Sequence, residues 1–160
     1  MRISIHNVRQ PFKVDTAALR RLASALAELA MARQPDTPQW REVTVYLLDD
    51  EGIAPINQAV MRHDGATDVV TQRYEPLPGE PPGLIGEIFV NVERACRAAP
   101  RRRGWSADRE LALYLAHGID HLTGADDRAP AGRARMRRRE LAWLRKLSLT
   151  PLFRTDNIKN

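Results

Sequence analysis

The stretch SADRELALYLAHGIDHL, residues 106–122, predicts the helix around which the rest of the chain is organised. Ser106 can cap its start by accepting hydrogen bonds from backbone N–H groups of the first turn. An apolar face at helical spacing consists of Leu111, Leu115, Gly118 and Leu122. We expect this face to pack against the core, with a second strip of side chains beside it.

That second strip carries two histidines, His117 and His121, which stand four residues apart and therefore project from the same side of a helix. Gly124 can end the helix in a left-handed conformation, so the chain can turn back and bring Asp127 under both rings. Two imidazoles and a carboxylate with a free fourth position are typical of a catalytic zinc site. The neighbouring Asp126 is the alternative third ligand, because one residue of difference in the turn could present it instead.

The flanking segments predict an α+β fold, with a central mixed four-stranded sheet packed with helices. Short apolar or alternating runs predict strands at 2–8, 41–48, 67–74 and 84–90. Helices are expected after Asp15, within 49–61, over 91–100 and from Pro130 onward. We expect a single domain over 1–150, followed by a C-terminal tail over 151–160.

The composition is that of a water-soluble protein of 160 residues, and no apolar run reaches the roughly 20 residues that a membrane helix needs. The N-terminal segment lacks the apolar stretch of a signal peptide, and the single cysteine, Cys96, cannot form an internal disulfide. These features favour a cytoplasmic location.

The net charge of +5 is concentrated in two arginine-rich segments, 101–103 and 128–146. The planar guanidinium group suits bidentate contacts with phosphate, so nucleic acid is favoured over an acidic membrane surface. The candidate RNA-binding residues are Arg101, Arg102, Arg103, Arg135, Arg138 and Arg139.

The segment HGIDHLTGADD (117–127) resembles the signature HGxLHLxGYDH of the YbeY family of endoribonucleases. The segment 56–71 is similar to the family's asparagine-to-TDV segment, through Asn57, Asp64, Thr67, Asp68 and Val69. The segment GEIFVNVERACRAA (86–99) is similar to its Gly-Asp/Glu-Ile strand and following helix, and the order of elements agrees over about 1–147.

The resemblance implies one zinc ion, held by His117, His121 and Asp127, and cleavage of single-stranded RNA. It also implies maturation of the 3′ end of small-subunit ribosomal RNA, a role in ribosome quality control, and the small ribosomal subunit as a partner. No membrane or DNA partner is expected.

The sequence departs from the family pattern at three positions. Asp127 replaces the usual third histidine, and Met61 stands where the family has an arginine. The adjacent Arg62 and His63 are therefore the candidate catalytic residues, as a phosphate contact and as an acid or base. Asp120 replaces a usually apolar residue and is expected to be a solvated or supporting carboxylate rather than a base.

Two other functions fit part of the pattern. A zinc peptidase would share the ligand spacing, but Gly118 stands where H-E-x-x-H enzymes carry their glutamate base. A non-catalytic ribosome-assembly or RNA-binding factor, with a structural metal, would account for the missing arginine at Met61.

Overall fold

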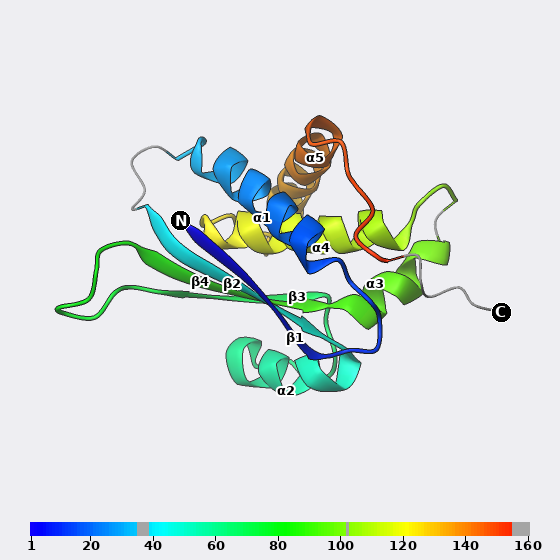
Figure 1. Cartoon of the computed structure of the whole chain (residues 1–160), viewed down its shortest axis with the longest axis horizontal. Coiled ribbons are helices and arrows are strands. Elements are labelled where there is room, and N and C mark those ends of the chain that lie inside the picture. The colour runs from blue at the N-terminus through cyan, green and yellow to red at the C-terminus, as the bar shows by residue number, and fades with distance from the viewer. Residues whose placement is uncertain (35–38, 102, 155–160) are drawn as a thin grey trace.

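The computed structural model describes residues 1–34, 39–101 and 103–154, and its centre is one four-stranded sheet (Figure 1). The strands are β1 (Arg2–Arg9), β2 (Trp40–Leu48), β3 (Val69–Tyr74) and β4 (Leu84–Asn91). Their order in the sheet is β1-β2-β4-β3. The β1–β2 and β2–β4 pairs are parallel, whereas β3 runs antiparallel to β4 at one edge. The predicted mixed sheet of an α+β fold is confirmed.

Helices cover the two faces of the sheet unequally. The helices are α1 (Thr16–Met31), α2 (Asp50–Met61), α3 (Val92–Ala98), the short 3-10 helix η1 (Ala99–Arg101), α4 (Ala107–Leu122) and α5 (Pro130–Lys146). In Figure 1, α1, α4 and α5 lie on one side of the sheet and α2 on the other. Because α4 also contacts α1, α3 and α5, it is the central helix of the fold.

Local capping explains where helices α1 and α4 begin. The Asp15 side chain accepts hydrogen bonds from the backbone N–H groups of Ala17 and Ala18, both at 3.0 Å, and so starts α1. The Ser106 hydroxyl accepts one from the N–H of Arg109 at 3.2 Å and starts α4. Both caps were expected from the sequence.

The main core lies between the inner face of the sheet and helices α1 and α4, and it includes Leu26, Val45, Ile88 and Leu115. A smaller cluster under α2 consists of Leu48, Ile53 and Val70. The start of the expected tail is docked: Leu152 is buried, and Phe153 forms an isolated bridge with Val14. Among the described residues, no helix is long and apolar enough to cross a bilayer.

Candidate metal centre

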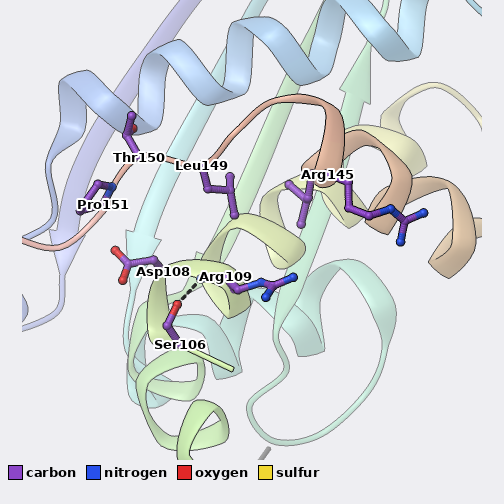
Figure 2. Close-up of a pocket in the computed structure, with 8 residues that line it drawn as sticks. Ser106, Asp108, Arg109, Arg145, Leu149, Thr150 and Pro151 are labelled. Carbon is purple, nitrogen blue, oxygen red and sulfur yellow. Dashed lines mark hydrogen bonds between the residues drawn. The ribbon is translucent and has the colours of Figure 1, made fainter. Parts of the chain in front are cut away.

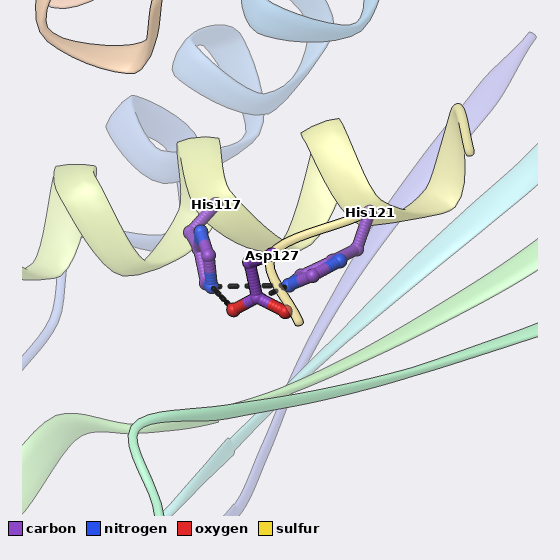
Figure 3. A group of neighbouring side chains, drawn as sticks. All are labelled: His117, His121 and Asp127. Carbon is purple, nitrogen blue, oxygen red and sulfur yellow. Dashed lines mark hydrogen bonds and ion pairs between the residues drawn. The ribbon is translucent and has the colours of Figure 1, made fainter. Parts of the chain in front are cut away.

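His117 and His121 project from the same side of α4, and the carboxylate of Asp127 lies between their rings (Figure 3). The two Nε2 atoms are 3.1 Å apart, and Oδ2 of Asp127 lies 3.6 Å from each of them. These three atoms lie close enough together to contact one ion. The structure thus brings together the three residues predicted as metal ligands.

Hydrogen bonds on the far side of each ring determine which nitrogen faces the cluster. Nδ1 of His117 lies 2.7 Å from Oε1 of Glu140, and Nδ1 of His121 lies 3.0 Å from the carbonyl oxygen of Ala125. A carbonyl oxygen can only accept, so His121 carries its proton on Nδ1. The Glu140 carboxylate favours the same tautomer for His117. Support of this kind orients metal-binding histidines and makes them better ligands.

The arrangement fits a cation. With both rings protonated on Nδ1, two Nε2 lone pairs and a carboxylate oxygen converge at 3.1–3.6 Å, and none of the three brings a donor hydrogen. Zinc–nitrogen bonds of 2.0–2.1 Å at tetrahedral angles place neighbouring ligand atoms about 3.3–3.4 Å apart. The observed separations bracket that value. A single ion would therefore satisfy all three acceptors without rearrangement.

The charges around His117 favour a positive species at this point. Burial of the ring lowers the pKa of His117, but the hydrogen bond and charge of Glu140, with the carboxylates of Asp68 and Asp127, raise it above its ordinary value. The surroundings therefore stabilise either a proton on the ring or a metal ion beside it, and the two compete for the same ligand.

The turn after α4 places Asp127. Gly124 has a φ of 90°, and the backbone N–H of Ala125 donates to the carbonyl of Asp120, so the helix ends in a left-handed cap as expected. Asp126 is instead paired with Arg128, which donates to both of its carboxylate oxygens and lowers the pKa of Asp126 to about 2. The geometry thus selects Asp127 over Asp126.

Helix α5 supports the site through two residues that the sequence analysis missed. Glu140 is fully buried and holds His117. Gly132 lies against the turn, so close that a Cβ atom there would stand 2.4 Å from the carbonyl oxygen of Asp126. A signal for Glu140 was present: it is the only acid among the arginines of α5, and it falls four residues after the buried Met136.

The segment before β3 approaches the site from the other side. Asn57 is buried and donates to the carbonyl of Gly65 at 2.9 Å, and Asn91 donates to the carbonyl of Thr67 at 3.0 Å. These bonds hold the 65–68 loop at the start of β3, where the charge of Asp68 acts on His117. The asparagine-to-TDV segment therefore holds Asp68 where its charge acts on the metal centre.

The remaining predicted site residues lie outside the triad. Arg62 caps the end of α2 in a left-handed conformation, and it and His63 are exposed. Within the described chain, no hydrogen bond or ion pair joins either of them to the triad, and their catalytic roles stay predictions. Of the predicted RNA-binding residues, Arg101, Arg103, Arg135 and Arg138 are exposed, Arg139 is half-buried, and Arg102 lies outside the described residues.

Asp120 is not solvated, contrary to one of the two expectations. It is fully buried, and Arg139 donates to both of its carboxylate oxygens. The helical-wheel argument missed this because it assigned α4 one apolar face, whereas α4 is enclosed on nearly all sides.

Gly118 is required by the contact between α4 and the sheet. A Cβ atom there would stand 2.7 Å from Cγ2 of Ile88 and 3.1 Å from Cγ2 of Val69. The glutamate base of H-E-x-x-H peptidases could therefore not be placed here without moving the helix. This observation weighs against the peptidase alternative.

A cavity of about 380 Å³ lies elsewhere, between the start of α4, the end of α5 and residues 149–151 (Figure 2). Its lining includes Ser106, Arg109 and Arg145. Ser106 precedes His117 by eleven residues, which is roughly 16 Å along the helix. The cavity is therefore separate from the triad.

Comparison with known proteins identifies relatives over nearly the whole chain. Residues 4–148 match the sequence profile of a family described as Endoribonuclease YbeY. A protein of that name from Rhodopirellula baltica is 39% identical over 108 residues, which cover 67% of this chain and 54% of the relative. Another from Pelotomaculum thermopropionicum is 32% identical over 154 residues, or 94% of this chain and 99% of the relative. The chain thus spans about half of the first relative and nearly all of the second.

A solved structure supports the fold. A protein from Thermotoga maritima, determined in solution, superimposes with a TM-score of 0.56 and covers 99% of both chains at 21% identity. At that identity the similarity concerns the fold alone.

Proposed function

The chain belongs to the Endoribonuclease YbeY family, and on that premise we propose that it is a zinc-dependent endoribonuclease specific for single-stranded RNA. The observation that carries the proposal is the convergence of three acceptors, from His117, His121 and Asp127, with both imidazoles held by bonds on their far sides. One zinc ion at this point would supply a Lewis acid that polarises a phosphoryl oxygen and lowers the pKa of a ligated water.

The protein's own residues would prepare that chemistry. The carboxylate of Glu140 and the carbonyl of Ala125 keep the Nδ1 protons on His117 and His121, so both Nε2 atoms remain free to bind. Three protein ligands leave a fourth position for a reactant, as in catalytic rather than structural zinc sites. This open position favours an enzyme over a factor with a purely structural metal.

The substrate proposal rests on charge. Arg101, Arg103, Arg135 and Arg138 are exposed, and guanidinium groups bind phosphate through paired hydrogen bonds. Binding of single-stranded RNA depends largely on such contacts with its backbone. Arg62 and His63, on the loop that leads to the metal centre, are our candidates for a phosphate contact and a proton donor or acceptor.

The biological proposal follows from the family. We infer that the substrate is a precursor of small-subunit ribosomal RNA, processed at its 3′ end on or near the small ribosomal subunit, with a further role in ribosome quality control. Such a substrate would place the activity in the cytoplasm.

The test combines metal content with RNA cleavage. Purified protein should contain about one zinc per chain and should cut a short single-stranded RNA but not a duplex, and a chelator should abolish the cut. His117→Ala should lose metal and cleavage together. Full cleavage by metal-free His117→Ala would refute the proposal, and casein hydrolysis by the native protein would favour the peptidase.

A further inference from the structure

The buried Asp120, which directly precedes the ligand His121 on α4, is paired with the half-buried Arg139 of α5. Neither residue has a part in the chemistry proposed above. We propose that this pair is a positioning device: it fixes α5 against α4 so that Glu140 stays on His117. The inference rests on the metal centre of the proposed function and adds two positioning residues to it.

Hydrogen bonds join the Arg139 guanidinium to both carboxylate oxygens of Asp120. Nε of Arg139 lies 3.1 Å from Oδ1 and 3.0 Å from Oδ2 of Asp120, and its Nη2 lies 2.6 Å from Oδ2. Arg33 adds a contact of 3.5 Å to Oδ1. The side chain of Asp120 is 0% exposed, so these contacts replace the water that its charge would otherwise require. A fork of this kind fixes orientation as well as distance.

The neighbouring residue on α5 makes the contact that matters for the site. Arg139 binds Asp120, and Glu140, next in sequence, binds His117 at 2.7 Å. Asp120 and His117 are three residues apart on α4. Two consecutive residues of α5 therefore bind α4 at two positions about one helical turn apart. A shift of α5 by one residue would move each side chain by about 1.5 Å and 100°, and would break both contacts.

Glu140 depends on this attachment because little else holds it. Among the described residues its Oε2 has no hydrogen-bond partner, and the nearest guanidinium, that of Arg137, is 3.9 Å away. Helix α5 also has few buried apolar side chains, namely Met136, Trp143 and Leu144. A buried polar pair can fix the register that so narrow an apolar face leaves loose.

The test is a double-mutant cycle read as zinc affinity. Asp120→Asn and Glu140→Gln should each weaken zinc binding by about tenfold, the lower end of the range for groups that support metal ligands. If Asp120 acts through Glu140, the double variant should be no weaker than Glu140→Gln alone. Glu42→Gln, which removes a β2 charge paired with Arg2 of β1, is the matched control and should bind zinc as the native protein does.

Two results would overturn the inference: unchanged zinc affinity in folded Asp120→Asn, or effects of the two substitutions that multiply to about a hundredfold. Arg139→Gln leaves Asp120 in contact with Arg33 and provides a second cycle with Glu140→Gln if Asp120→Asn does not fold. Arg139→Gln should also weaken zinc binding about tenfold, and its effect should likewise not add to that of Glu140→Gln.

A measurement on the metal-free protein separates this inference from the proposed function. The Nδ1 proton of His117, bonded to Glu140, should give a downfield imidazole resonance in the native protein and lose it in Asp120→Asn or Arg139→Gln. If the native protein bound no zinc, this readout would still decide the positioning role. A resonance unchanged in both variants would contradict it.

Discussion

Replacing Gly132 with alanine should displace Asp127 from the two imidazoles. The added Cβ would stand 2.4 Å from the carbonyl oxygen of Asp126, about 1 Å short of an ordinary contact. Either the helix or the turn must yield, and Asp127 is the next residue of that turn. Metal sites tolerate deviations of about 0.2 Å in ligand distance. We therefore expect zinc affinity to fall by about 10–100-fold, as for loss of a group that supports a ligand.

The assay is competition for zinc with a chromophoric chelator, accompanied by thermal unfolding of the metal-free protein. Without a clash, a Gly132→Ala substitution in the first turn of α5 should gain at most about 0.8–1.0 kcal/mol of helix propensity. If the added Cβ does clash, the overpacking should destabilise the fold by about 1–3 kcal/mol and so cancel or exceed that gain. Ala134→Ser, which adds one atom at an exposed position of α5, is the control. A Gly132→Ala variant that melts higher and binds zinc normally would refute the reasoning.

Three further predictions concern the sheet contact, the RNA and a helix cap. Gly118→Glu should lower the free energy of unfolding by at least about 1–3 kcal/mol through its clash with Ile88, and should not hydrolyse casein; a stable, active peptidase would contradict this. Arg138→Ala should weaken RNA binding and reduce the slope of log K against log salt by about 0.7, whereas the exposed Arg20→Ala on α1 should change neither. Backbone hydrogen bonds from Ala18 and Ala17 lower the pKa of Asp15, so its cap is fully effective above the unfolded-state value and is lost as pH falls through the folded one. Asp15→Ala should therefore have a lower melting temperature than the native protein at neutral pH, and this difference should shrink in acid. An equal difference in melting temperature at both pH values would exclude the cap.

The parts of the structure that could be predicted from sequence are those fixed by local geometry. Asp15 and Ser106 cap helices through N–H groups two or three residues away, so the starts of α1 and α4 were predictable. His117, His121 and Asp127 fall within eleven residues, and helix periodicity with one glycine turn suffices to bring them together.

The features of the site that could not be predicted from sequence depend on how α5 packs against α4. Glu140 reaches His117 from 23 residues away, and no periodicity within either helix encodes that contact. Asp120 was assigned partly to solvent because a helical wheel assumes that one side of a helix faces water. The central position of α4 removes most of that side, and a charge at a buried position of this helix must find a partner on a neighbour, here Arg139.

Helix α5 therefore combines two tasks. Its inner side positions the metal centre, through Glu140 on His117 and through Gly132 against the turn that carries Asp127. Its outer side exposes Arg138, and Arg135 is exposed beside Gly132; we propose that both contact RNA. Because an RNA strand bound to the outer arginines would contact the same rigid helix that orients the ligands, its position relative to the metal would be fixed by α5 itself. Substitutions on the outer side should then affect mainly RNA affinity and its salt dependence, whereas those on the inner side should affect mainly metal affinity and the rate of cleavage.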